Sequence, residues 1–202
     1  MRFEDYKLIF IVVGLIGVLL ISSATFGEFF YPSGGEQFSE LYLLGPGHTV
    51  ENYPFNVATG QNYSVYVDVI NNMRSSTYMV LYVKMRNLTE QSPNVTMATP
   101  SSLPPLYEFR FVVQDNQTWE SRLTFSISDV SINNNQSSIK QLTINDNTIN
   151  VDKTEIWNAN ATMYYYQLFL ELWIYDAQLH SFEYSNRFVS LELNLTRSQQ
   201  SP

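Results

Sequence analysis

Hydrophobic and polar residues alternate with a period of two along most of the chain beyond residue 60. In residues 62–70, NYSVYVDVI, the side chains of Tyr63, Val65, Val67 and Val69 share one face of an extended strand, and polar side chains dominate the other. The same alternation recurs in residues 77–85, 106–113, 119–128, 163–176 and 188–195. One apolar face and one polar face are typical of antiparallel strands that are buried on a single side.

Turn-forming residues separate these runs, and no stretch within residues 38–197 has helical periodicity. The breaks are the segment 70–77, a long Pro/Ser/Asn/Thr loop at 87–105, a hairpin turn at 114–118, a second turn at 131–138 and a bend at 144–150. Seven to nine short strands divided by such breaks predict an all-β fold, an immunoglobulin-like antiparallel β-sandwich.

An apolar N-terminal run, Leu8 to Gly27, holds no charged residue and is long enough to cross a bilayer as a helix. Basic Arg2 and Lys7 precede it and Glu28 follows, so the positive-inside rule places the N-terminus in the cytoplasm. A cleaved signal peptide is the alternative, because Ser22, Ser23 and Ala24 could form a cleavage site. Both interpretations put the remaining chain outside the cell.

The expected organisation follows from this segment. It comprises a cytoplasmic N-terminus (1–7), a transmembrane helix (8–27), a juxtamembrane linker (28–37), an extracellular β-sandwich (38–197) and a disordered tail (198–202).

The triplet Asn-X-Ser/Thr, the acceptor for N-linked sugar, is repeated more often than its composition predicts by chance. The seven acceptors are Asn62, Asn87, Asn94, Asn116, Asn135, Asn160 and Asn194. On the predicted strands and loops, all of them fall on polar faces, in turns or just before a strand. A composition rich in Asn, Ser and Thr is the alternative explanation. The pattern predicts a glycoprotein whose sugars cover its surface.

The composition excludes several classes of partner and site but does not identify an activity. The 202 residues carry a net charge of −8, which disfavours nucleic acid as a partner. There is no cysteine, so disulfides and thiolate metal sites are excluded. His48 and His180 are the only histidines, and no nucleophile, phosphate-loop or zinc motif occurs. We therefore expect no catalytic residue, no cofactor and no metal site, with a weak calcium site in residues 145–152 as an open alternative.

The run MYYYQLFLELWIYD, residues 163–176, has aromatic side chains on both faces of its predicted strand. One face is the expected core. The other carries Phe169, Trp173 and Tyr175 beside polar residues and forms a candidate interface. Three interpretations remain open: a loop such as 87–105 covers this face, a protein partner binds it, or sugar rings stack on it.

The segment from FSELYLLGPG to the strand at 77–85 resembles an archaeal membrane-protein family catalogued as domain of unknown function 1616. The matching positions are Phe38, Glu40, Leu41, Tyr42, Gly45, Pro46, Tyr53, Pro54, Gly60, Asn71 and Tyr78. The resemblance is good over residues 38–85, and it departs from the family in having one membrane segment where many relatives have several. It implies an archaeal cell envelope and no particular chemistry.

Together these patterns predict a non-catalytic cell-envelope protein at the plasma membrane, with its C-terminal domain extracellular. Its expected role is that of a structural or accessory interaction subunit for other envelope or membrane-complex proteins. The alternative is an extracellular module that binds carbohydrate or another solute through the exposed aromatic strand face, and a hydrolase is a remote third class.

Overall fold

The computed structural model describes residues 6–7, 11–18 and 36–196. The chain forms two compact units, residues 1–37 and 38–202. In the first unit, the described residues 6–7 and 11–18 are helical. The ten strands lie in the second unit, and the first of them begins at Phe38.

The predicted transmembrane helix, residues 8–27, lies mostly outside the described residues, which include only its positions 11–18. Among residues 6–7, 11–18 and 36–196, no helix is both long and apolar enough to span a bilayer. Most of the predicted linker, 28–37, and the predicted tail, 198–202, also lie outside the described residues.

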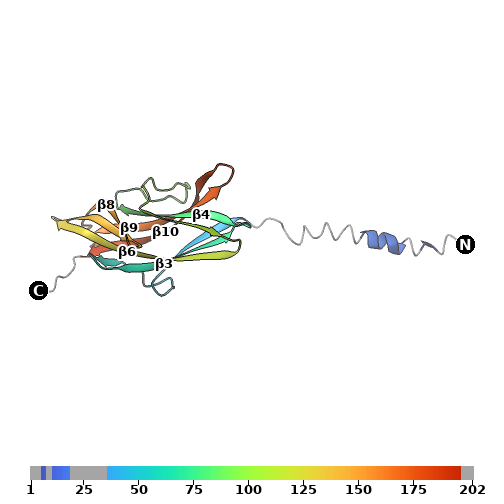
Figure 1. The fold of residues 1–202 in the computed structure, drawn as a ribbon, viewed down its shortest axis with the longest axis horizontal. Coiled ribbons are helices and arrows are strands. Elements are labelled where there is room, and N and C mark those ends of the chain that lie inside the picture. Colours follow the sequence, from blue (N-terminus) through green and yellow to red (C-terminus); the bar gives the residue numbers. More distant parts are fainter. Residues whose placement is uncertain (1–5, 8–10, 19–35, 197–202) are drawn as a thin grey trace. The chain divides into compact units, whose positions relative to one another are not determined.

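The second unit consists of two five-stranded sheets (Figure 1). Sheet A has the order β1-β3-β6-β7-β8, with β1 at Phe38–Leu44, β3 at Tyr63–Asn72, β6 at Gln117–Asn133, β7 at Gln136–Ile144 and β8 at Asn147–Ile156. Sheet B has the order β2-β10-β9-β4-β5, with β2 at Asn56–Ala58, β4 at Thr77–Asn87, β5 at Tyr107–Val113, β9 at Tyr165–Asp176 and β10 at Ser181–Thr196. Every neighbouring pair is antiparallel except β2 and β10, which run parallel.

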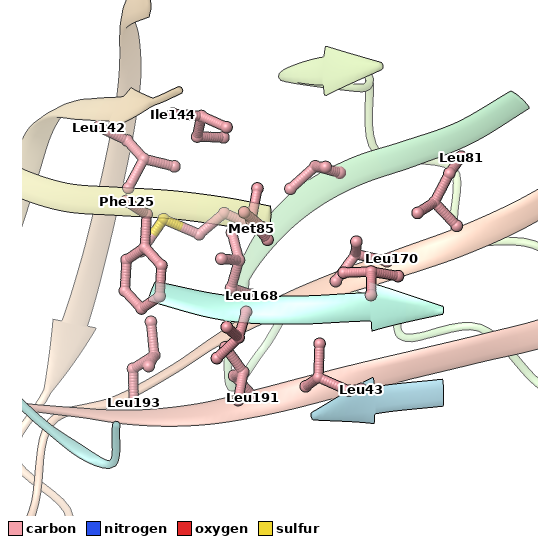
Figure 2. Close-up of a cluster of buried hydrophobic side chains, with 14 of the residues drawn as sticks. Leu43, Leu81, Met85, Phe125, Leu142, Ile144, Leu168, Leu170, Leu191 and Leu193 are labelled. Carbon is pink, nitrogen blue, oxygen red and sulfur yellow. The ribbon is translucent and has the colours of Figure 1, made fainter. Parts of the chain in front are cut away.

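The core lies between the two sheets, and the predicted strand phases are confirmed there. Val65, Val67 and Val69 of β3 are fully buried, as are the alternate residues of β4 from Met79 to Met85. Figure 2 shows side chains from both sheets meeting in this layer, among them Phe125 of sheet A and Leu168 of sheet B. Burial of these apolar side chains, at about 25 cal/mol per Å², is the main force that holds the sheets together.

Two predicted connections differ from the structure. Residues 114–118 were expected to form a hairpin turn, but β5 belongs to sheet B and β6 to sheet A, so this segment crosses between the sheets. Residues 73–76 cross in the same way from β3 to β4. A turn composition shows that the chain reverses, but the strand that becomes its neighbour depends on packing between the sheets.

The described residues 36–196 form ten strands where seven to nine were expected. Strand β2 has only three residues, too few to establish a period of two. Strand β10 begins seven residues before the alternation that predicted it, because a register shift between Tyr184 and Arg187 interrupts the pattern.

Candidate functional site

Strand β9 is buried on both of its faces along its middle. Leu168, Leu170 and Leu172 point into the core between the sheets, and Phe169 and Glu171, on the opposite face, are equally inaccessible. A strand in the middle of a sandwich sheet normally exposes its outer face to water. Something therefore covers the outer face of sheet B at this point.

The cover is the loop between β4 and β5, residues 88–106. Ser101 of this loop donates its backbone N–H to Oε1 of Glu171 at 2.7 Å. Lys84 of β4 donates from Nζ to the backbone carbonyl of Ser101 at 2.8 Å and to Oε2 of Glu171 at 2.8 Å. The Lys84 and Glu171 side chains are only 4% and 0% exposed, so this is a buried ion pair that clamps the loop to the sheet.

The loop is held at its start as well. Arg86 donates from Nη1 to the carbonyl of Glu90 at 2.5 Å. The Glu90 carboxylate accepts from Lys153 of β8, also at 2.5 Å. The N–H of Leu88 donates to the carboxylate of Glu155 at 2.7 Å. The loop is therefore fastened to both sheets and forms a defined wall beside the outer face of sheet B.

Beside this wall, six aromatic side chains lie together on the outer face of sheet B, and we call them the outer aromatic cluster. They are Tyr78, Tyr82, Trp173, Tyr175, Phe182 and Tyr184. They come from β4, β9 and β10, whose register places Trp173 opposite Tyr184 and Tyr175 opposite Phe182. Neighbouring rings lie 5.1 to 6.0 Å apart at angles of 51° to 72°, the tilted and edge-on geometry that aromatic pairs favour.

A pocket of about 440 Å³ opens between the loop and the cluster. Its lining is Tyr82, Lys84, Pro100, Ser101, Pro105, Trp173 and Phe182. The walls are mainly apolar, and the polar groups at the base are already bonded: Lys84 and Ser101 join the clamp, and the indole N–H of Trp173 donates to Glu171 at 3.3 Å. The volume suits a single side chain or a small ring.

Tyr184, at the edge of the cluster, holds an unpaired polar group. Its hydroxyl is buried and has no hydrogen-bond partner among the described residues. Burial, followed by the nearby negative charge of Glu171, raises the pKa of Tyr184 to about 12. The phenol is therefore neutral at physiological pH and presents an O–H donor rather than an anion.

Of the three residues predicted as a candidate interface, the structure brings two into the outer aromatic cluster and buries the third. Trp173 and Tyr175 are half-buried members of the outer aromatic cluster. Phe169 is fully buried, so its assignment to an exposed face was wrong. The 88–106 loop covers the same strand face at Glu171, which was one of the three interpretations left open for this face.

Four cluster members were missed in the sequence, namely Tyr78, Tyr82, Phe182 and Tyr184. The signal for Tyr78 and Tyr82 was present, since both fall on the face of β4 opposite the core residues. Phe182 and Tyr184 lie before the register shift in β10, so the regular alternation further along that strand did not reveal them.

The predicted sugar acceptors lie at or near the surface. Asn62, Asn94, Asn116, Asn135 and Asn160 are exposed, whereas Asn87 and Asn194 are half-buried. The amide of Asn87 donates to the carbonyl of Thr154 at 2.8 Å, and that of Asn194 donates to Asn56 at 2.9 Å. Asn116 is exposed, but its amide also donates, to Asp115 at 3.0 Å. Three of the seven acceptor amides therefore already donate to partners in the chain.

The residues considered for metal binding occupy separate places. His48 lies in the loop between β1 and β2, where its ring stacks on Tyr66 of sheet A and its Nδ1 is 3.1 Å from the carboxylate of Glu120. His180 lies in the turn between β9 and β10. In the 145–152 segment, Asn145 accepts from Thr124 and Asp152 pairs with Lys140. Within residues 36–196, no three His, Asp or Glu side chains converge in a way that could hold a metal ion.

Comparison with known proteins gives a family but no activity. The model of a family described as "Domain of unknown function (DUF1616)" matches residues 32–138, more than half of the chain. A search of curated proteins found no match.

Similar solved structures include a β-glucosidase from Listeria innocua in complex with glucose, at 11% identity and a TM-score of 0.38, covering 80% of this chain and 17% of the enzyme. The same enzyme with gluconolactone gives 10% identity and a TM-score of 0.34, with the same coverage. Spo0M, a sporulation control protein from Bacillus subtilis, gives 11% identity and a TM-score of 0.27, covering 80% of this chain and 91% of that protein. The chain thus spans less than a fifth of the β-glucosidase.

Proposed function

Because the chain belongs to the DUF1616 family, whose description assigns no activity, we propose its function from the outer face of sheet B. The protein is a non-catalytic cell-envelope component. Its extracellular, immunoglobulin-like β-sandwich acts as an accessory interaction subunit that binds a protein partner through the outer aromatic cluster. The family resemblance noted in residues 38–85 is confirmed and extends over residues 32–138.

The observation that carries this proposal is the outer aromatic cluster itself, half-buried beside a loop that is fixed by a buried ion pair. Aromatic side chains are enriched at the centres of protein interfaces, where one ring can supply a large part of the binding energy. Because the clamp already holds the loop in place, a partner would not have to order it. Such preorganisation lowers the entropic cost of binding.

The ring geometry favours a protein partner over a sugar. A sugar ring stacks on a flat, open aromatic face and needs free polar groups for its hydroxyls. Here the neighbouring rings are tilted by 51° to 72°, so they form a corrugated surface and not a plane. The polar groups at the pocket base are bonded to one another. A pocket walled by Pro100, Pro105 and aromatic rings suits an apolar side chain of a protein.

The proposed location rests on the sequence. The uncharged run from Leu8 to Gly27 is long enough for a membrane anchor, and Arg2 and Lys7 favour a cytoplasmic N-terminus. The exposed sugar acceptors suit an extracellular domain. A protease-protection assay on intact cells tests this: digestion of the β-sandwich from outside is expected, and complete protection would contradict it.

The test of the function is crosslinking mass spectrometry on native membranes with the wild type, Trp173→Ala, Phe182→Ala and the control Tyr42→Ala. Tyr42 is an exposed aromatic residue, 42% accessible, on sheet A, whereas the proposed surface lies on sheet B. We expect Trp173→Ala and Phe182→Ala to reduce crosslinks to one reproducible partner by at least about tenfold. The control should retain them, and thermal unfolding should show that all variants are folded.

Two results would reject the proposal. One is that folded Trp173→Ala and Phe182→Ala proteins keep their crosslinks. The other is that the wild type has no protein partner but shows a saturable change in tryptophan fluorescence with oligosaccharides, which the Trp173→Ala variant lacks. That second result would establish the carbohydrate-binding alternative.

A further inference from the structure

A separate pocket of about 380 Å³ lies at one end of the β-sandwich, where the turn between β6 and β7 meets the ends of β8 and β10. It is lined by Asn135, Trp157, Tyr164, Asn194, Leu195 and Thr196. An apolar ring surface and several amide or hydroxyl groups therefore face the same space. This mixture suits a ligand that has both an apolar face and polar edges, such as a sugar ring.

Trp157 supplies the apolar surface of this pocket. Its side chain is 38% exposed, and its ring is held edge-on against Tyr164 with 5.0 Å between ring centres and an angle of 72°. Its backbone N–H donates to the carbonyl of Asn135 at 2.7 Å. The contacts with Tyr164 and Asn135 fix the position of this indole.

Two of the pocket-lining residues, Asn135 and Asn194, are sugar acceptors in Asn-X-Ser/Thr triplets. Asn194 is half-buried, and its amide both donates and accepts a hydrogen bond. Its Nδ2 donates to Asn56, and its Oδ1 accepts from the N–H of Tyr164. Asn135 is exposed at the tip of the β6–β7 hairpin, and its side chain makes no hydrogen bond within residues 36–196. Asn135 is therefore the acceptor that can carry a sugar without breaking an existing contact.

We propose that an N-linked sugar on Asn135 occupies this pocket and packs its apolar face on Trp157. The sugar is attached when Nδ2 of Asn135 loses one proton and bonds to the anomeric carbon of a lipid-phosphate-linked oligosaccharide. The bond from that carbon to the phosphate oxygen breaks, and the phosphate leaves with the electron pair. The first sugar then lies beside the indole. Asn194 and Thr196 border it, and their side chains keep their bonds to Asn56 and Val57.

The structure also sets the order of events. Ser137, the hydroxyl residue of this acceptor triplet, is fully buried, and its Oγ lies 2.8 Å from the hydroxyl of Tyr166 on β9. A transferase that must contact Ser137 cannot reach it once sheets A and B have packed together. Attachment at Asn135 therefore precedes packing of β7 against β9, and the sugar is present while the pocket forms.

The experiment uses the full chain, made in a host that attaches sugar at Asn-X-Ser/Thr. The variants are Asn135→Asp, which removes the acceptor, and Asn134→Asp, which adds the same charge in the same turn without touching an acceptor triplet. Both asparagines have a positive φ, 49° for Asn134 and 63° for Asn135, which aspartate also tolerates. Each variant is combined with Trp157→Ala and with Trp157→Leu, which keeps an apolar contact for Tyr164. Glycopeptide mass spectrometry gives occupancy, and thermal unfolding gives Tm.

We expect Asn135 to be occupied in the wild type. Asn135→Asp should lower Tm by about 2–4 °C, and Asn134→Asp should leave it nearly unchanged. In both Trp157 backgrounds, Asn135→Asp should have almost no further effect, because the indole on which the sugar packs is gone. Wild-type protein made without glycosylation should unfold like Asn135→Asp.

Three results would overturn the proposal. The first is that Asn135 is unoccupied while other acceptors carry sugar, and the second is that Asn135→Asp lowers Tm equally with and without Trp157. The third is that removal of residues 197–202 lowers Tm as Asn135→Asp does, and only when Trp157 is present. The last would make the C-terminal segment the occupant. The proposal rests on the extracellular location but not on the outer aromatic cluster, so a failure here leaves the Trp173 crosslinking test unaffected. Sugar on none of the seven acceptors would overturn this proposal and remove the sugar-based support for the extracellular location.

Discussion

The buried ion pair between Lys84 and Glu171 gives the most direct test of how the outer face of sheet B is built. The change to make is Glu171→Gln, which keeps the shape of the side chain and removes its charge. The amide oxygen can still accept from the N–H of Ser101. The amide nitrogen then takes the position of Oε2, 2.8 Å from Nζ of Lys84 and 3.3 Å from the indole nitrogen of Trp173, so it opposes two other donors.

The expected cost follows from the burial of both groups. The Lys84 ammonium stays in place, 4% exposed, with only the carbonyl of Ser101 as a partner. Breaking a buried pair by removing one partner destabilises a protein by about 3–5 kcal/mol. Removing both charges in Lys84→Met/Glu171→Gln leaves no unpaired ion but still loses a donor to the Ser101 carbonyl, at about 1–3 kcal/mol. The double variant should therefore be more stable than the single one.

The control is Glu108→Gln on the same sheet. Glu108 pairs with Arg110 at 2.6 Å, but both side chains are more than 40% exposed, so the loss should stay below about 1 kcal/mol. Guanidinium unfolding followed by tryptophan fluorescence gives the free energy of unfolding for all four proteins. If Glu171→Gln costs no more than Glu108→Gln, or if the double variant is less stable than Glu171→Gln, the clamp does not hold the loop as described.

Two further predictions concern the crossovers and sheet A. Asn71 is fully buried, and its amide donates to the carbonyls of Ser75 and Val113 at 2.8 Å each. Asn71→Ala should therefore lower the free energy of unfolding by about 2–4 kcal/mol, whereas Asn72→Ala, at the half-buried neighbouring position, should lower it by less than about 1 kcal/mol. Equal losses for the two variants in urea unfolding would contradict this. Partial burial and then the charge of Glu120 raise the pKa of Asp68 above 3.8, although His48 opposes the shift. The folded state therefore binds this proton more tightly than the unfolded state, and the contribution of Asp68 to stability falls as pH rises from about 4 through the raised pKa. Asp68→Asn should remove that fall, so its Tm relative to the wild type should be higher at pH 7 than at pH 3.5; a constant difference in Tm would show that Asp68 does not titrate with folding.

The sequence alone was enough to predict an all-β domain after residue 37 and the faces of its main strands. In a strand the side chains alternate strictly, so Val65, Val67 and Val69 must share a face, and burying three valines together is favourable in any arrangement of sheets. The turn composition also marked where the chain reverses. The turn predicted at 131–138 and the bend predicted at 144–150 are, in the structure, the β6–β7 and β7–β8 hairpins, where pairs of asparagine or aspartate residues adopt positive φ.

The sugar acceptors were equally readable, because the triplet is a local signal. The sequence did not show whether a sugar on one of these acceptors would have a surface to pack against. Trp157 and Asn135 are 22 positions apart and come together only because β8 ends beside the β6–β7 turn.

Only the tertiary structure decided which strands become neighbours and what lies above sheet B. The segment 114–118 resembles a hairpin locally, yet it crosses between the sheets, because pairing between strands depends on how the whole core is filled. Phe169 and Trp173 lie on the same face of one strand in the same kind of sequence, but one is buried and the other is half-exposed. The 88–106 loop covers this face at Glu171, and Lys84, Ser101 and Glu171 fix the loop from positions up to 87 residues apart. Contacts across such a distance leave no periodic trace in the sequence, so the candidate site appears only once the chain is folded.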